Sequence, residues 1–382
     1  MGSTVGFSND ISKFVDSLLR DGKAGVSSGT MRIQDIGSSG SSLAKQPCSD
    51  RFKLAIPYAG RTIVWEVMFN HYQPDDPPDF IFGPEDKDFQ PDIEDLKNLV
   101  NWDAEKSESL LLVVDELLEA YRNYQQDLLS EVSRLQFEYT SLIETNEGVE
   151  LSASDIEVHV TLKDKQYDRI GPVTFLIKLP VDFSQIPPYL TKNNPGVDSA
   201  VLVVTFPTVD GCKAVPQLFL SPRVEHALGG SNNLRIPTFA NGGCLIDYVP
   251  QVVTLLKNKV DQVSTSYAKR KEYISCFLSA FGKSVVEHDV EGFMKITFLM
   301  TWHDFFFLVC IELTSTFPSE QPAFTLQSVY HESGDGKPFS KPFSNYPYSP
   351  RWSPKEMAER ARQYLLDNIG QFQKTSVKDG SL

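Results

Sequence analysis

The stretch Tyr72-Gln-Pro-Asp-Asp-Pro-Pro78 decides the interpretation of the first part of this chain, because it separates two apolar runs. Before it, over 62–69, apolar residues alternate as in a strand packed mainly on one face of a sheet. These alternating residues are Ile63, Trp65, Val67 and Phe69. After it comes Phe80-Ile-Phe82. Because proline fixes its φ angle and donates no backbone hydrogen bond, the prolines predict a rigid corner at the end of an antiparallel meander.

A helix and strands precede this corner, and a second helix follows it. Near the N-terminus, apolar residues recur at helical spacing behind the candidate caps Ser8, Asn9 and Asp10. The apolar residues are Ile11, Phe14, Val15, Leu18 and Leu19. Strands are predicted over 31–36, 52–56 and 62–69, with a Gly- and Ser-rich loop over 37–42. After an acidic loop, a long helix is predicted from Leu110.

The same order of elements recurs twice, with corners at Pro187 and Pro322. In the middle part, apolar residues at helical spacing over 128–142 are followed by four predicted strands and then by a predicted helix over 248–263. The four strands are 156–162, 173–179, 200–206 and 217–220. In the C-terminal part, a helix around 267–281 precedes predicted strands at 284–288, 293–300, 305–313 and 323–329. The closing helix begins at Ser353-Pro-Lys-Glu356, where Ser353 is a candidate cap and Glu356 completes a capping box.

Internal repetition fixes an architecture when it is present. We therefore predict an α+β chain of three successive domains, residues 1–128, 129–263 and 264–382. The alternative is that helices, strands and prolines simply follow one another in an ordinary α+β chain. The middle repeat is the weakest of the three, because its corner lacks the early proline and its Gly-rich insertion is long.

Composition narrows the classes of function. The chain has 382 residues and a net charge of -14, from 36 basic and 50 acidic side chains. Such a surface repels phosphate backbones and anionic lipid, so we expect no nucleic-acid and no membrane partner. The longest strictly apolar run, Phe305–Ile311, is far too short to span a bilayer, and no secretory signal is expected at the N-terminus. Five widely spaced cysteines without a CxxC pair favour a reduced intracellular protein.

The first corner resembles that of the ubiquitin-conjugating-enzyme fold. The matching residues are Tyr72, Pro74, Pro77, Pro78 and Phe82. Trp352-Ser-Pro354 likewise resembles the Trp-Ser-Pro that precedes the last helix in that family. This resemblance implies tandem ubiquitin-conjugating-enzyme-variant domains (UEV, or RWD-like), each an antiparallel meander flanked by helices.

Over nearly its whole length the chain resembles the BRE family, the brain and reproductive organ-expressed proteins. The stretches that carry this resemblance are 51–60, 77–83, 179–184, 220–230, 243–251 and 345–352. It implies a non-catalytic scaffold or adaptor subunit in BRISC, a deubiquitinase complex specific for lysine-63-linked ubiquitin chains, and in its nuclear DNA-damage-response relative. Such a subunit would connect an Abraxas-family scaffold and its JAMM-type deubiquitinase subunit to a von Willebrand A-like subunit, in cytoplasm and nucleus. Ubiquitin binding by one copy stays open.

An active conjugating enzyme needs a cysteine that carries ubiquitin as a thioester, and a polar group that stabilises the oxyanion. The first copy has no cysteine between Cys48 and Cys212, and the third has none after Cys310. Neither copy is therefore expected to form the thioester.

The middle copy contains a degenerate version of the catalytic stretch, Ile236–Asp247. Pro237, Gly242 and Cys244 match the family's pattern, whereas Ile236 replaces its His and Thr238 replaces the Asn that stabilises the oxyanion. We interpret Cys244, with Pro237 and Thr238, as a pseudo-active site rather than a catalytic one. Most free cysteines are small, partly buried apolar residues, and no His or Lys lies beside Cys244 in the sequence.

Other chemistries have weaker support. The six histidines form no HExxH or His-x-His pattern, and the Gly pairs form no nucleotide-binding loop, so no metal and no cofactor are expected. Lys269-Arg-Lys271 fits a solvated helix face better than an import signal. The acidic stretch 84–95 lacks calcium-loop spacing, which favours a solvated loop and leaves partner recognition as the second interpretation. Its acidic residues include Glu85, Asp86, Asp88, Asp92 and Glu94.

Two alternatives to the scaffold remain open. One is a residually active ubiquitin carrier that uses Cys244. The other is a UEV adaptor that captures proline-rich peptides through the first copy.

Overall fold

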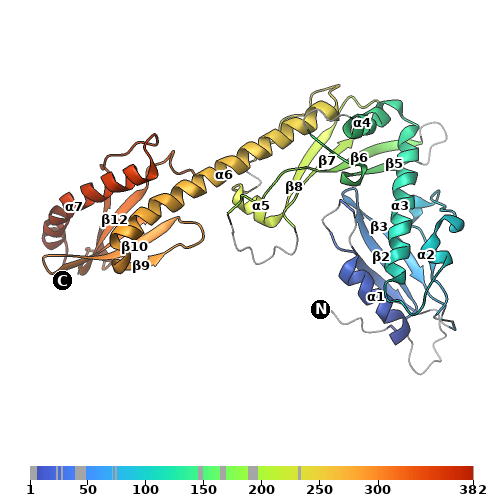
Figure 1. The fold of residues 1–382 in the computed structure, drawn as a ribbon, viewed down its shortest axis with the longest axis horizontal. Helices are drawn as coiled ribbons and strands as arrows, with labels where there is room; N and C mark the ends of the chain where they lie inside the picture. The colour runs from blue at the N-terminus through green and yellow to red at the C-terminus, as the bar shows by residue number, and fades with distance from the viewer. Residues whose placement is uncertain are drawn as a thin grey trace. The chain divides into compact units, whose positions relative to one another are not determined.

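The described part of the chain contains three antiparallel sheets with flanking helices, and each sheet is built from strands in chain order (Figure 1). The structure is a computed structural model that describes residues 7–22, 25–26, 29–38, 49–70, 72–73, 75–144, 149–163, 169–187, 197–230 and 234–381. The chain forms two compact units. The first comprises Met1–Val181, Pro195–Ser221 and Arg235–Leu255, and the second comprises Asp182–Asn194, Pro222–Leu234 and Leu256–Leu382. The first unit contains two sheets and the second contains one.

The first sheet has the order β1-β2-β3-β4. Its strands are β1 (Arg32–Gly37), β2 (Arg51–Tyr58), β3 (Arg61–Met68) and β4 (Asp79–Ile81). The face that carries Phe52 and Leu54 packs against α1 (Asn9–Asp21) and α3 (Ser109–Ser130), which contribute to one buried core. Between β4 and α3 lie the 3-10 turns η1 (Pro84–Asp86) and η2 (Ile93–Asp95) and the short helix α2 (Lys97–Val100).

The start of α1 follows the predicted capping. Ser8 has extended backbone angles, and its hydroxyl accepts a hydrogen bond from the Ile11 N–H at 3.4 Å. A side-chain acceptor at this position satisfies one of the free N–H groups of the first helical turn. The cap is thus Ser8 rather than Asn9 or Asp10, which belong to the helix.

The second sheet, of order β5-β6-β7-β8, is buried on both faces over most of β5, β6 and β7. Its strands are β5 (Ile156–Leu162), preceded by η3 (Ala153–Asp155), β6 (Ile170–Lys178), β7 (Ala200–Phe206) and β8 (Val215–Leu220). Leu176, Val201 and Val203 pack into the core of the first sheet and its helices. The continuous apolar composition of these strands follows from this two-sided burial.

A buried carboxylate joins the two sheets of the first unit. Glu157 on β5 is 1% exposed and accepts hydrogen bonds from the Val26 N–H at 2.8 Å and the Ala59 N–H at 2.9 Å. The Arg122 guanidinium lies 4.0 Å from it. A buried charge is tolerated when it is paired and hydrogen-bonded in this way. The first two sheets therefore behave as one packed body.

The helix predicted over 128–142 is divided into two. The N–H groups of Glu131 and Val132 donate to the carbonyl three residues earlier instead of four, at 3.3 and 3.0 Å. Helix α4 (Ser133–Glu144) then begins. Such 3-10 bonds are common at helix ends. The turn keeps the apolar residues of α4, Leu135, Tyr139 and Leu142, buried.

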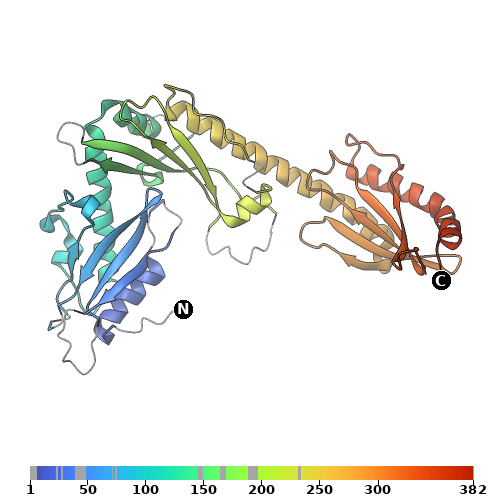
Figure 2. The same cartoon turned by 180° about the vertical axis from the view of Figure 1, so that it is seen from behind.

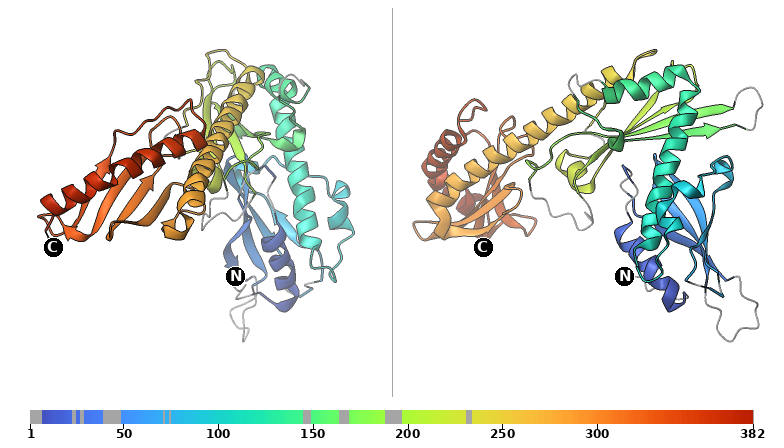
Figure 3. Two further views of the ribbon diagram at one scale, coloured as in Figure 1. Left: turned by 60° about the vertical axis from the view of Figure 1, so that its left-hand side comes forward. Right: turned by 45° about the vertical axis from the view of Figure 1, so that its right-hand side comes forward.

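The second unit contains the third sheet, of order β13-β12-β11-β10-β9. Its strands are β9 (Val285–His288), preceded by η5 (Gly282–Ser284), β10 (Lys295–Trp302), β11 (Phe305–Glu312), β12 (Ala323–Glu332) and β13 (Pro338–Phe343). Helix α7 (Pro354–Asp379) lies along one face of this sheet (Figure 3, left). Ser353 caps α7 as predicted, since its hydroxyl accepts a hydrogen bond from the Glu356 N–H at 3.2 Å. The short helix α5 (Pro222–Ala227) also belongs to this unit.

Strand β13 is absent from the sequence prediction. Its residues, Pro338 to Phe343, include two prolines, which argue against a strand. The structure accommodates them because β13 is an edge strand, where a missing N–H costs no ladder hydrogen bond on the open side. The third sheet therefore has five strands instead of the predicted four.

One helix, α6 (Leu245–Phe281), replaces the two helices predicted at 248–263 and 267–281 (Figures 1 and 2). It passes through the boundary predicted at 263/264, and the boundary predicted at 128/129 lies within α3. Its residues up to Leu255 belong to the first unit, and the remainder to the second. The division into three domains stays a prediction. Among the described residues, no helix has the length and apolar character needed to cross a bilayer.

Candidate functional site

Cys244 immediately precedes the first residue of α6. Its carbonyl accepts hydrogen bonds from the N–H groups of Asp247 at 3.2 Å and Tyr248 at 3.1 Å. The preceding turn requires Gly242, whose φ of 71° lies in the left-handed region that glycine adopts without strain. The Gly242 N–H also donates to the Cys212 carbonyl at 2.9 Å. Local turn chemistry therefore fixes the cysteine at the beginning of the helix.

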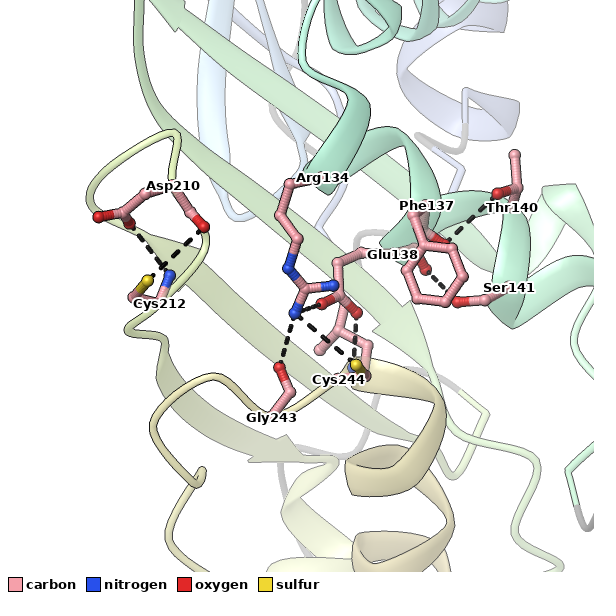
Figure 4. A network of polar contacts seen from close by, with 10 residues as sticks. Arg134, Phe137, Glu138, Thr140, Ser141, Asp210, Cys212, Gly243 and Cys244 are labelled. Carbon is pink, nitrogen blue, oxygen red and sulfur yellow. Dashed lines mark hydrogen bonds and ion pairs between the residues drawn. The ribbon is translucent and has the colours of Figure 1, made fainter.

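An arginine from α4 contacts this cysteine (Figure 4). Nη2 of Arg134 lies 3.7 Å from the Cys244 Sγ and donates to the Gly243 carbonyl oxygen at 2.9 Å. The same nitrogen lies 2.6 Å from Oε1 of Glu138, one helical turn away. Three acceptors thus share a single guanidinium nitrogen, and the sulfur is the most distant of them.

Glu138 connects α4 to the start of α6. Its side chain is fully buried, and its Oε2 accepts a hydrogen bond from the Leu245 N–H at 2.6 Å. Burial raises the pKa of Glu138 above its ordinary value, although this hydrogen bond and the Arg134 charge act in the opposite direction. A carboxylate at this position satisfies a free N–H of the first turn and interacts favourably with the helix dipole. Glu138 therefore holds the start of α6 against α4.

The other residues of the predicted pseudo-active site have different environments. The Pro237 carbonyl accepts a hydrogen bond from the Tyr248 hydroxyl at 2.7 Å. Phe239 packs edge-on between Phe206 and Tyr248. Thr238 is exposed, and within the described part of the chain it forms no hydrogen bond with Cys244. The structure therefore brings Pro237 and Cys244 to the same end of α6, without directing the Thr238 hydroxyl at the sulfur.

This arrangement has little of what thioester chemistry needs. A nucleophilic cysteine requires an exposed sulfur, a base or cation that activates it, and a donor aimed at the oxyanion. Cys244 is half-buried, and Arg134, its cationic neighbour, is held by Glu138. No histidine in the described residues forms a hydrogen bond with the Cys244 thiol. The geometry is that of a packed turn with a cysteine in it.

Comparison with known proteins identifies the family. The model of the family described as "Brain and reproductive organ-expressed protein (BRE)" matches residues 7–332. The chain belongs to the BRE family. A Branchiostoma floridae relative is 48% identical over 376 residues, which is 97% of this chain and 96% of the relative. A Danio rerio relative is 49% identical over 371 residues, or 96% of this chain and 94% of the relative. Each of these relatives is named "BRISC and BRCA1-A complex member 2".

The remaining cysteines of this BRE-family chain lie in dissimilar places. Cys212 is exposed, and its thiol lies 3.8 Å from the Asp210 carbonyl oxygen. Burial raises the pKa of Cys276 and of Cys310, which disfavours their thiolates. Cys48 lies outside the described residues, as do His71 and Pro74. Within the described part of the chain, no group of His, Cys, Asp and Glu side chains could hold a metal ion.

Sequence reasoning missed Arg134 and Glu138. Their i, i+4 spacing predicts a helical ion pair and nothing more. Their contacts with Gly243, Cys244 and Leu245 join segments more than a hundred residues apart, at separations of 107 to 110. Only the packing of α4 against the start of α6 brings these groups together.

Proposed function

We propose that this BRE-family chain is a non-catalytic scaffold subunit of BRISC and of the BRCA1-A complex. One observation carries the proposal: relatives about half identical to it, over 96–97% of its length, are named as members of these complexes. Identity at this level over the whole chain leaves no large segment from which an unrelated function could arise. The surfaces that bind neighbouring subunits are therefore expected to be retained.

The fold supports the absence of catalysis. The meanders with flanking helices are consistent with tandem UEV domains, and a conjugating-enzyme ancestry explains why a Gly-turn-Cys stretch survives at 242–244. At that stretch Ile236 and Thr238 stand where catalysis needs His and Asn. In this chain the Arg134–Glu138 ion pair forms hydrogen bonds with the backbone at that turn and packs it against α4. A carrier that has lost its chemistry and kept its shape is suited to holding other proteins.

The proposed neighbours follow from the family resemblance. They are a JAMM-type deubiquitinase subunit, an Abraxas-family scaffold and a von Willebrand A-like subunit, which this chain would connect. The substrate of the assembly would be lysine-63-linked ubiquitin chains, in the cytoplasm for BRISC and in the nucleus for the BRCA1-A complex. Ubiquitin itself is a further candidate ligand of one domain.

Affinity purification tests the proposal. The tagged full-length chain is expressed in cultured animal cells, and the proteins that copurify are identified by mass spectrometry. We expect a JAMM-type deubiquitinase among them, and cleavage of lysine-63-linked tetraubiquitin by the eluate that a zinc chelator abolishes. Lysine-48-linked tetraubiquitin serves as the matched control substrate. An eluate without such a deubiquitinase contradicts membership in these complexes.

A further inference from the structure

Two adjoining hollows lie on the first unit, beside the segment that connects β4 to α3. One has a volume of about 470 Å³ and is lined largely by apolar residues, among them Phe80, Ile81, Ile93 and Leu99. The other, of about 320 Å³, is lined by four aspartates: Asp88, Asp92, Asp95 and Asp127. The hollows have four lining residues in common, Phe89, Gln90, Pro91 and Leu96, so they form one continuous depression.

The first hollow leaves apolar surface in contact with water. Ile81 is 49% exposed and Ile93 is 65% exposed, beside the half-buried Phe80 and Leu99. Covering such side chains is favourable because it removes apolar surface from water. Ile81 also belongs to β4, an edge strand of the first sheet. An edge strand beside an apolar pocket is a common docking place for an extended peptide.

The second hollow determines the charge of the ligand. No lysine or arginine lines this second hollow, and the one cationic residue that lines the first is Lys87. The Asp88 carboxylate pairs with Arg169 at 3.1 Å, and the Asp92 carboxylate accepts a hydrogen bond from the Glu94 N–H at 3.0 Å. In the part of the chain that the structure describes, the side chains of Asp95 and Asp127 have neither a hydrogen bond nor an ion pair. Their negative charge is therefore available to a cationic partner.

We propose that this depression binds an extended segment of a partner protein that carries an apolar side chain next to lysine or arginine. The apolar side chain fills the hollow between Ile81 and Ile93, and the cationic side chain lies between Asp95 and Asp127. The acidic stretch of the sequence is then a recognition element. This site is independent of the proposed complex membership, because it follows from the shape and charge of the first unit alone.

Labelled peptides test the site with the full chain. Fluorescence anisotropy measures the binding of fluorescein-labelled decapeptides with a Gly-Ser background. Two mixed probes carry Leu-Phe and Lys-Arg-Lys in either order, and two further probes carry only the apolar or only the basic residues. We expect at least one mixed probe to bind about tenfold more tightly than either single-feature probe, because it gains a buried apolar contact and two exposed ion pairs. Raising the salt concentration should weaken it.

Two double variants separate the contributions. Ile81→Ser with Ile93→Ser should weaken the mixed probe about tenfold. Asp95→Asn with Asp127→Asn should weaken it about threefold and flatten its salt dependence. The matched controls are Val377→Ser, an exposed apolar residue on α7, and Glu150→Gln, an exposed acidic residue outside both hollows. The four side chains changed in the two double variants are all exposed, and circular dichroism checks that each variant is folded.

Two results would overturn the proposal. In the first, the mixed probes bind no more tightly than the single-feature probes, or the double variants bind them as the controls do. In the second, sedimentation shows that the full chain self-associates and that Ile81→Ser with Ile93→Ser abolishes this. The depression would then bind a second copy of the chain.

Discussion

His159 on β5 shows how burial sets the charge of a single residue. It is 4% exposed, and its Nδ1 has no hydrogen-bond partner in the described structure. Burial, with a smaller contribution from the Arg61 charge, lowers its pKa from 6.5 to about 4. The folded chain therefore keeps this imidazole neutral at pH values where the unfolded chain protonates it.

The free energy of unfolding is therefore expected to fall as the pH is lowered. Between pH 6.5 and 4 the unfolded chain binds the additional proton, so the stability contributed by His159 is complete above pH 6.5 and is lost as the pH falls. The expected loss is about 3 kcal/mol over this interval. Urea unfolding at several pH values, with hydrogen exchange at the β5 amides to identify the transition, should give a flatter profile for His159→Gln. The exposed His288 provides the control, His288→Gln, and an unchanged slope in His159→Gln would refute the assignment.

At the candidate site, the sequence singled out Cys244 and Pro237 but not the side chains that contact the turn before α6. Cys244 and Pro237 lie at one end of α6 because a short Gly-containing turn brings them there, and such a turn can be recognised locally. Arg134 and Glu138 could not be assigned to the site. Their roles arise from a contact between α4 and α6, and no local pattern encodes a pairing between segments so far apart.

At the scale of elements, hydrophobic periodicity predicted the existence and type of most helices and strands. It failed where tertiary context overrides local preference. The prolines of β13 are tolerated because this strand lies at the edge of its sheet. Helix α6 continues through 264–266, a Ser-Thr-Ser run of mediocre helix formers. The core of the second unit uses the later turns of α6, through Tyr273, Ile274 and Phe277.

This use of α6 predicts which fragments fold. A fragment of residues 264–382 keeps the core side chains of α6 and also Arg270, which donates to the Gly292 and Ser315 carbonyls at 3.1 and 3.0 Å. We expect it to unfold cooperatively and to give dispersed amide resonances. A fragment of residues 282–382 lacks Tyr273, Ile274 and Phe277, each of which contributes about 2–5 kcal/mol by burial, and should be unfolded.

Thermal unfolding and NMR spectra of the two fragments make the comparison. An unfolded 264–382 fragment would show that the C-terminal domain needs more of the chain than predicted. A folded 282–382 fragment would show that α6 is dispensable for its core.

At the scale of the whole molecule, we propose that the chain keeps the shape of a conjugating enzyme without its chemistry. The net charge of -14 disfavours nucleic-acid binding, and among the described residues no group of His, Cys, Asp and Glu side chains could hold a metal ion. The chain's successive sheet-and-helix modules present surface on which partner proteins could bind. The scaffold interpretation therefore requires that the chain be needed for the activity of a complex while its own cysteine is not.

Complementation measures this requirement directly. Animal cells depleted of the endogenous BRE-family protein receive either the wild-type chain or Cys244→Ala, and the immunopurified deubiquitinase complex is assayed on lysine-63-linked tetraubiquitin. We predict that depletion reduces cleavage and that the two chains restore it equally. Failure of a folded Cys244→Ala chain to restore cleavage, or full cleavage without any chain, would contradict the account.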